Sequence, residues 1–219
     1  MSEQKLLLHN YFRSSTSIRL RAALNYKGVD YEYVAYNLRT NENNKPEYLA
    51  KNPAGLVPAL ELADGTVLTQ SLAIIEWLEE VYPQPPLLPA DPIGRAQVRS
   101  MAYMIACEIH PLNNLRVLDQ IRAYGQDEAG VKAWFNQWVH TTFVPLEQIL
   151  ATSPNTGQYC YGDTPSLADT CLFAQMLNNQ RFNVDTSVYP TIERIFAALN
   201  QLEAFQRAIP ANQPDAIIA

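Results

Sequence analysis

The spacing of apolar and polar residues differs between the first part of this chain and the rest. In the first 82 residues, short apolar runs alternate with stripes of helical spacing. Leu6 to Leu8 is an apolar run typical of a buried strand. Leu20, Ala23 and Leu24 share one helical face, and the alternation from Tyr31 to Asn37 predicts a second strand. The chain therefore begins with strand, helix and strand.

A hairpin and a further helix follow in the same segment. The runs 57–62 and 66–68 flank Asp64-Gly65, a strong signal for a tight turn between two strands. Apolar residues spaced three and four apart then predict a helix from Ser71 to Tyr82. The predicted elements, β-α-β-β-β-α, resemble the order β-α-β-α-β-β-α of a thioredoxin-like domain.

The second half of the chain carries helical spacing only. The segment 83–89 is so rich in proline that it cannot form regular structure. Beyond it, apolar residues recur on helical faces: Val98, Met101, Ala102, Ile105; Val131, Trp134, Trp138, Phe143; Ile192, Ile195, Leu199, Leu202. We predict an α/β domain at 1–82, a linker at 83–91 and an all-α helical domain at 92–219. We expect 210–219 to be loosely ordered.

Composition narrows the class of protein. Hydrophobic residues make up 47% and charged residues 17%, as in an ordinary globular protein, and the net charge is −6. Scattered basic residues in an acidic chain argue against a nucleic-acid partner. The start, 1–5, lacks the features of a signal peptide, and no apolar run is long enough to span a membrane. Cys107, Cys160 and Cys171 form no Cys-x-x-Cys pair, which favours a reducing, cytoplasmic location.

Hydroxyl side chains are concentrated where the first helix should begin. Ser14 to Ser17 precede the apolar face of that helix, which Lys27-Gly28 brings to an end, and Arg13, Arg19 and Arg21 lie close by. The unpaired N–H groups and partial positive charge of a helix N-terminus suit a bound anion or thiolate. A plain serine cap with solvated arginines explains the same residues equally well.

Further motifs favour the binding interpretation. The segment 52–60, which contains Val-Pro, and Gln70-Ser71 before an apolar helix follow the serines in the order found in glutathione transferases, whose glutathione-binding half this region resembles. The form Ser-Ser-x-x-x-Arg-x-Arg at 14–21 is similar to the zeta class. Segments 110–116 and 162–169 extend the resemblance over nearly the whole chain, toward the maleylacetoacetate and maleylpyruvate isomerases.

The resemblance implies a thioredoxin-like domain followed by a helical domain, and glutathione as cofactor. It implies a cis–trans isomerase that converts maleylacetoacetate, a small dicarboxylate diketo-acid, to fumarylacetoacetate in tyrosine and phenylalanine catabolism. Maleylpyruvate isomerase, a conjugating glutathione transferase and a non-catalytic binding module are the alternatives. The resemblance also implies a homodimer. Neither a metal nor a membrane is expected.

The resemblance favours Ser14 as the residue that donates a hydrogen bond to the glutathione thiolate. Ser15 and Thr16 are alternative donors that the sequence does not separate from it. Many zeta-class proteins have cysteine where this chain has Thr16. The reacting thiol is therefore expected to be that of glutathione, because the protein offers no cysteine at this place.

Other residues are expected to hold the rest of glutathione. In this fold the peptide bond between Val57 and Pro58 is cis, and the Val57 backbone pairs with the cysteinyl unit as a short strand does. Gln70 and Ser71 are expected to hold the γ-glutamyl carboxylate at a helix N-terminus. Lys51 is a candidate for the glycyl carboxylate.

A third group should serve the substrate. His110-Pro111 interrupts a helical pattern that runs from 94 to 124, and Asn113 and Arg116 follow it. The resemblance places Asn113 near glutathione, in its own or a neighbouring subunit. The resemblance implies that Arg13 and Arg181 lie over the active site. Because guanidinium groups match carboxylates, these two and Arg116 are candidates to bind the anionic substrate, with His110 beside them.

One motif is structural. Ser166 and Asp169 have the spacing of a capping box before an apolar helix. We expect Asp169 to stabilise the fold and to take no part in catalysis. As a lost helix cap, Asp169→Ala should cost about 1 to 2 kcal/mol.

Overall fold

The computed structural model describes residues 5–216, and these form two compact units. The first comprises 5–87 together with 202–216, and the second comprises 88–201. The change between units at 87 and 88 falls inside the proline-rich segment. The structure differs from the predicted domains at the other end, because 202–216 returns to the first unit. The ends of the two predicted domains, 1–4 and 217–219, lie outside the described residues.

A four-stranded mixed sheet forms the centre of the first unit. Its strands are β1 (Leu6–Asn10), β2 (Tyr31–Ala35), β3 (Ala59–Glu61) and β4 (Val67–Thr69), in the order β2-β1-β3-β4. Strands β1 and β2 are parallel, whereas β3 pairs antiparallel with both β1 and β4. In this register Leu8 of β1 stands opposite a residue of β2 on one side and of β3 on the other.

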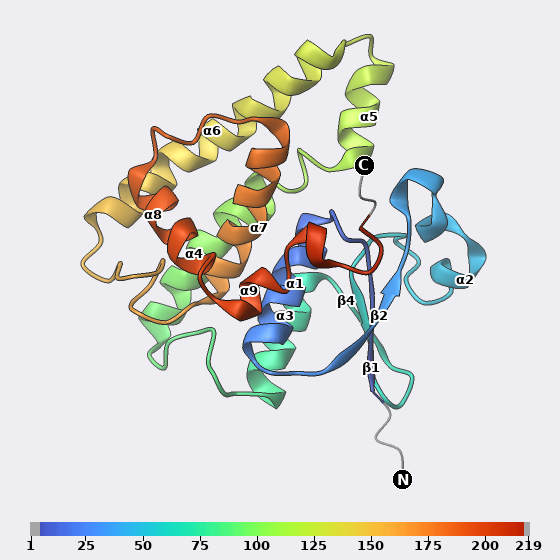
Figure 1. The fold of residues 1–219 in the computed structure, drawn as a ribbon, viewed down its shortest axis with the longest axis horizontal. Helices are drawn as coiled ribbons and strands as arrows, with labels where there is room; N and C mark the ends of the chain where they lie inside the picture. The colour runs from blue at the N-terminus through green and yellow to red at the C-terminus, as the bar shows by residue number, and fades with distance from the viewer. Residues whose placement is uncertain (1–4, 217–219) are drawn as a thin grey trace. The chain divides into compact units, whose positions relative to one another are not determined.

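Three helices complete the predicted order of elements. Helices α1 (Ser15–Tyr26) and α3 (Ser71–Val81) pack against each other on one side of the sheet, and α2 (Pro46–Leu49) lies on the other side (Figure 1). Two 3₁₀ turns, Leu38–Thr40 and Glu42–Asn44, precede α2. This arrangement confirms the thioredoxin-like fold that the sequence predicts.

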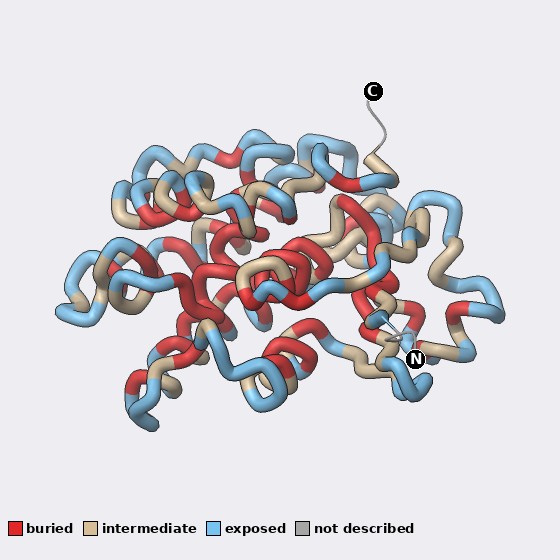
Figure 2. The backbone as a smooth tube through the Cα atoms, turned by 60° about the horizontal axis from the view of Figure 1, so that its bottom comes forward, coloured by how far each residue is buried: buried red, intermediate tan, exposed pale blue. Residues whose placement is uncertain are grey.

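The second unit is helical. Its helices are α4 (Pro92–Glu108), α5 (Leu115–Ala123), α6 (Glu128–Thr152), α7 (Leu167–Phe182) and α8 (Pro190–Leu199). Helices α4 and α8 pack on α7, and both also contact α6. Helix α7 is buried on nearly all sides over its first ten residues. It is the core helix of this unit, which explains why it lacks an amphipathic pattern. Buried, intermediate and exposed positions alternate along many of the helical segments in Figure 2.

The helical pattern from 94 to 124 is two helices rather than one kinked helix. Helix α4 ends at Glu108, and α5 begins at Leu115. Pro111 cannot donate a backbone hydrogen bond, and the side chain of Asn114 caps the new helix by accepting the N–H of Arg116 at 3.2 Å. The sequence predicts an interruption at His110-Pro111, and the structure has a complete break there, because the sequence offers a stop and a new start within four residues.

The expectation that the C-terminal segment is loosely ordered is wrong over 210–216. Helix α9 (Glu203–Gln206) packs on α1, and a 3₁₀ turn follows at Pro210–Asn212. Asp215 then accepts hydrogen bonds from the Phe12 N–H, at 3.2 Å, and from the hydroxyl of Tyr33. The segment is therefore part of the first unit. Across residues 5–216, none of the helices has the length and apolar character needed to cross a bilayer.

Candidate active site

Three groups form a chain of hydrogen bonds at the start of α1. Ser14 is the N-cap residue, and its Oγ accepts the Ser17 N–H at 3.3 Å. Ser14 Oγ lies 2.7 Å from Thr16 Oγ1, which donates to the carbonyl oxygen of Val57 at 2.8 Å. A hydroxyl has one proton, so Thr16 must accept from Ser14. Ser14 is thus the hydroxyl whose proton can be redirected to a ligand while the bond to Val57 stays intact.

Val57 lies on the segment that leads into β3. The Val57–Pro58 peptide bond is cis, as the resemblance implies. The preceding carbonyl, that of Leu56, is fixed by the Tyr48 hydroxyl at 2.6 Å and by Asn52 Nδ2 at 2.7 Å. Within the described part of the chain, the Val57 N–H makes no hydrogen bond. A backbone donor on a fixed segment is what an extended peptide ligand requires.

Gln70 and Ser71 begin α3. Gln70 is the N-cap residue and has φ of 66°, a left-handed conformation that costs energy for a residue with a side chain. Ser71 is buried, and its Oγ accepts from Arg19 Nε at 2.8 Å. The first N–H groups of an α-helix have no partner within the helix. Those of α3 can therefore bind a carboxylate, with Arg19 fixing the position of Ser71 from α1.

Lys51 belongs to a cluster of charged groups on the sheet side of the first unit. Its Nζ lies 2.6 Å from Glu61 Oε2, which also contacts His9 Nε2 at 2.9 Å. The other ring nitrogen of His9 lies 3.0 Å from the Tyr36 hydroxyl. The hydrogen bond from Lys51 lowers the pKa of Glu61, and burial lowers the pKa of His9. Lys51 is thus engaged by Glu61, and a ligand carboxylate has to share it.

Arg13 and Ser15 flank Ser14. The Arg13 guanidinium lies over the ring of Phe12, 4.7 Å from its centroid. A cation held over an aromatic ring retains donors for an anion. Ser15 is the first residue of α1 and lies between Ser14 and Thr16 in the sequence. Both are positioned by the same turn as Ser14.

His110, Asn113 and Arg116 lie in the second unit, around the break between α4 and α5. His110 and Asn113 are buried, whereas Arg116 is exposed in the first turn of α5. Asn113 Nδ2 donates to the carbonyl of Phe135 at 3.1 Å. Its Oδ1 is buried and has no hydrogen-bond partner among residues 5–216. Such an acceptor is expensive to leave unsatisfied, which suits a residue that binds a ligand donor.

Aromatic stacking brings Arg181 to the same part of the second unit. Its guanidinium lies 5.1 Å from the centroid of the Phe182 ring. Phe182 stacks on Phe135, with centroids 4.0 Å apart, and Phe135 carries the carbonyl that Asn113 contacts. The structure thus groups Asn113 and Arg181 through two stacked rings, a relation that sequence spacing does not reveal.

Three residues that hold the backbone before Ser14 were not predicted as part of the site. They are Arg21, Asp215 and Tyr33. The guanidinium of Arg21 is fully buried, not solvated, and donates to the carbonyls of Tyr11, Phe12 and Ala208 and to Asn10 Oδ1. Asp215 accepts the Phe12 N–H, and Tyr33 donates its hydroxyl proton to Asp215. Three arginines near a helix start are a signal in the sequence, but nothing local marks Asp215.

Family models match both units. A model of the glutathione S-transferase N-terminal domain matches residues 13–81, and one of the C-terminal domain matches 119–209. Together they span most of the chain. The chain therefore belongs to the glutathione S-transferase family.

Individual relatives narrow this class. The chain is 51% identical to maleylpyruvate isomerase of a Ralstonia species, over 95% of this chain and 98% of that protein. It is 44% identical to maleylacetoacetate isomerase of Pseudomonas aeruginosa, over 95% and 97%.

Solved structures with similar folds carry the same two enzyme names. A holo maleylpyruvate isomerase, described as a bacterial zeta-class glutathione S-transferase, superposes with a TM-score of 0.94 at 50% identity, covering 96% of this chain and all of that one. The maleylacetoacetate isomerase of Methylobacterium extorquens with bound malonate and glutathione gives 0.93 at 40% identity, covering 96% and 99%.

The residues of the first unit fit a bound glutathione. They offer a hydroxyl at a helix N-terminus, a backbone N–H without an acceptor in the described chain, and the start of α3. These match a thiol, an extended peptide backbone and a carboxylate respectively. Within residues 5–216 no three His, Cys, Asp or Glu side chains gather as metal ligands do.

Proposed function

We propose that this protein is a glutathione-dependent cis–trans isomerase of a maleyl diketo-acid. The observation that carries the proposal is the Ser14–Thr16–Val57 chain, which joins a thiol-binding hydroxyl to the backbone segment that receives a peptide. Bound glutathione supplies a thiolate that adds reversibly to the cis double bond, so that the bond can rotate before the thiolate leaves.

Ser14 stabilises the ionised form of the glutathione thiol. An ordinary cysteine thiol has a pKa of about 8.5, and lowering it by about two units takes roughly 2.7 kcal/mol of preferential stabilisation. A hydrogen bond from Ser14 Oγ, together with the partial positive charge of the α1 N-terminus, is of the right size. The Val57 N–H, Gln70 and Ser71 hold the peptide and its γ-glutamyl carboxylate. Lys51 serves the glycyl carboxylate.

The arginines bind the substrate. Arg13 and Arg181 take its carboxylates, and Arg116 and His110 stabilise the negative charge that develops on its oxygen. Asn113 contacts glutathione in its own subunit or in the partner of a homodimer. We also propose a cytoplasmic location, which the free thiols of Cys107, Cys160 and Cys171 suit.

Two substrates fit this chemistry. Maleylacetoacetate and maleylpyruvate differ in the tail beyond the diketo-acid, and relatives of both names match over the full length. Conversion of maleylacetoacetate belongs to tyrosine and phenylalanine catabolism, and conversion of maleylpyruvate to aromatic-acid degradation.

The test is an isomerisation assay of the purified protein with each substrate, with and without glutathione. We expect glutathione-dependent conversion of the cis to the trans form, and the ratio of the two kcat/KM values names the preferred substrate. A protein that binds glutathione but converts neither substrate is a conjugating transferase or a binding module, and contradicts the proposal. A stable thioether product identifies the former.

A matched pair of variants tests the thiolate donor. Ser14→Ala should lower kcat/KM by about a hundredfold, as for other donors aimed at a reacting anion, and raise the pKa of the bound thiol. Ser15→Ala should change both far less. The pKa is read from the ultraviolet absorbance of the bound thiolate during a pH titration. The opposite ranking of the two variants assigns the donor role to Ser15.

A further inference from the structure

Two hydrogen bonds hold the turn that carries Ser14, one at the backbone carbonyl of Phe12 and one at its backbone N–H. The Phe12 carbonyl accepts from Arg21 Nη2 at 2.9 Å, and the Phe12 N–H donates to Asp215 at 3.2 Å. One residue earlier, the Tyr11 carbonyl accepts the Ser14 N–H at 3.1 Å and also lies within 3.4 Å of Arg21 Nη1. The backbone that precedes Ser14 is therefore fixed by two side chains from outside the turn.

Arg21 faces the turn on one side and the C-terminal segment on the other. Its Nη2 also donates to the carbonyl of Ala208 at 2.9 Å, and its side chain has no exposed surface. A buried guanidinium is stable only when acceptors surround it. Ala208 in the C-terminal segment supplies one of those acceptors, so the segment helps to hold Arg21 against the turn.

Asp215 forms the second connection. One carboxylate oxygen accepts from Phe12 and the other from the Tyr33 hydroxyl on β2. Burial raises the pKa of Tyr33, and the bond to Asp215 adds to this, so the phenol remains a donor. The next residue, Ala216, packs on the buried cluster that contains Tyr11, Phe12 and Val57.

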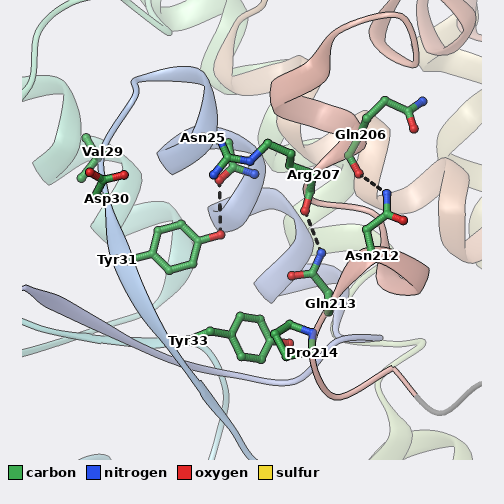
Figure 3. A pocket seen from close by; sticks show the side chains of 10 residues that line it. All are labelled: Asn25, Val29, Asp30, Tyr31, Tyr33, Gln206, Arg207, Asn212, Gln213 and Pro214. Carbon is green, nitrogen blue, oxygen red and sulfur yellow. Dashed lines mark hydrogen bonds between the residues drawn. The ribbon is translucent and has the colours of Figure 1, made fainter.

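Hydrogen bonds within the C-terminal segment, 202–216, shape its backbone so that Asp215 lies next to Phe12. Gln213 is buried, and its Nε2 donates to the Arg207 carbonyl at 2.7 Å (Figure 3) and to the Ile209 carbonyl at 2.8 Å. Tyr33 and Pro214 line the same pocket (Figure 3). The connection from β2 to the turn thus runs through a segment shaped by its own hydrogen bonds.

We propose that Asp215, oriented by Tyr33, is a positioning residue that fixes the Phe12–Ser14 turn and so aims the Ser14 hydroxyl at the glutathione thiol. This rests on the proposed function, because it takes Ser14 as the thiolate donor. Asp215 touches neither glutathione nor the substrate in this role. It acts only through the backbone of Phe12, two residues before Ser14.

Four variants test the proposal. Asp215→Ala removes both hydrogen bonds, Tyr33→Phe removes one and keeps the ring, and Asp215→Asn retains an acceptor for Phe12. Asn212→Ala is the matched control, since among residues 5–216 its exposed side chain bonds only to the Gln206 carbonyl. For each we measure the amide exchange of Phe12 in the protein without glutathione, the pKa of the bound thiol, and kcat and KM separately.

Asp215→Ala should speed Phe12 exchange, raise the pKa of the bound thiol and lower kcat/KM about tenfold, since a small misplacement of a catalytic group is costly. Tyr33→Phe should do the same to a smaller degree. Asp215→Asn should restore most of the loss, and Asn212→Ala should change nothing. Unchanged Phe12 exchange and thiol pKa in Asp215→Ala overturn the proposal, whatever happens to its melting temperature.

The Ser14→Ala variant separates this proposal from the proposed function. If Ser14→Ala leaves the thiol pKa unchanged, the donor assignment fails, and the role of Asp215 is judged from Phe12 exchange and the glutathione dissociation constant alone. If Ser14→Ala raises that pKa while Asp215→Ala does not, Ser14 is the donor and the positioning role of Asp215 is wrong.

Discussion

The hydroxyl of Thr16 connects two parts of the site that lie 41 residues apart in the sequence. Because its proton goes to the Val57 carbonyl, Thr16 acts toward Ser14 as an acceptor. A cysteine at this position is a weaker donor to a carbonyl. We therefore expect Thr16 to order the site, to compete with a bound thiolate for the Ser14 proton, and not to be the thiolate donor itself.

This arrangement predicts that removing the Thr16 hydroxyl affects bound glutathione differently from removing the Ser14 hydroxyl. Thr16→Val should weaken glutathione binding about fivefold, since one hydrogen bond of about 1 kcal/mol no longer holds Val57. It should not raise the pKa of the bound thiol, because the proton of Ser14 loses its competing acceptor. Thr16→Ser is the control and should retain wild-type binding. Calorimetric titration with glutathione and the thiolate absorbance check both, and a raised thiol pKa in Thr16→Val contradicts the proton assignment.

At the scale of elements, a buried ion pair joins the ends of α1 and α3. Lys27, the residue that ends α1, pairs with Glu79 of α3 and donates to the carbonyls of Tyr82 and Pro85 at 2.8 and 3.0 Å. Glu79 also accepts the Leu87 N–H at 2.8 Å. The proline-rich segment cannot form regular structure itself, so these two side chains provide the partners for its backbone.

Removing one member of this pair should destabilise the protein strongly. Lys27→Met leaves the Glu79 carboxylate buried without its cation, and we expect a loss of about 3 to 5 kcal/mol in the free energy of unfolding. The double variant Lys27→Met, Glu79→Gln should recover part of it, since no isolated charge remains. Urea unfolding of the four proteins in the cycle measures the coupling. Additive losses in the double variant contradict the ion-pair account.

The capping box at α7 also binds the loop that precedes the helix, through Asp169. Asp169 is fully buried and accepts from the Ser166 N–H at 2.8 Å, the Ser166 hydroxyl at 2.6 Å and the Cys160 N–H at 2.9 Å. Burial raises its pKa against the effect of these bonds. The carboxylate thus joins the loop before α7 to the core helix of the second unit.

Asp169→Ala should therefore cost more than the 1 to 2 kcal/mol of a lost cap. It leaves buried N–H groups without partners, at about 1 to 3 kcal/mol each, so we expect a loss of about 3 kcal/mol or more. Asp127→Ala, which removes an exposed N-cap from α6, is the control and should cost about 1 kcal/mol. Equal shifts of the two thermal midpoints would return Asp169 to the role of a simple cap.

At the scale of the whole molecule, the cluster of His9, Glu61 and Lys51 makes stability depend on pH. Burial lowers the pKa of His9, so the unfolded chain binds a proton more readily than the folded protein. The contribution of His9 is complete above the ordinary histidine pKa of about 6.5 and decreases as the pH falls below it. The lowered pKa of Glu61 acts in the same direction below about pH 4.3.

His9→Asn tests this in the higher window. The variant should be less stable than the wild type near pH 8, because the contact with Glu61 is lost. Its stability should change less between about pH 8 and about pH 5, because the titrating group is gone. Urea midpoints across this range provide the measurement, with Glu61→Gln showing its difference at lower pH. Parallel pH curves for wild type and His9→Asn contradict the assignment to His9.

Local sequence signals predict most of the fold and the first half of the site. The hydroxyls at 14–17, the Asp64-Gly65 turn and the helical stripes each act over a few residues, so their patterns are visible in the sequence. The contacts that were missed are distant. Arg21 and Ala208 are 187 residues apart, and Phe12 and Asp215 are 203 apart. Periodicity holds no information about such pairs, because each partner has a different local surrounding.

The bond between Phe12 and Asp215 has a consequence for synthesis. The second unit, 88–201, is inserted between the two pieces of the first. Domains generally fold as they leave the ribosome, N-terminal first. Here the sheet emerges early, but the turn before Ser14 gains its last hydrogen bonds only after residue 215 has been translated. A nascent chain that still lacks that residue therefore carries Ser14 on a turn whose Phe12 N–H does not yet have Asp215 as its acceptor.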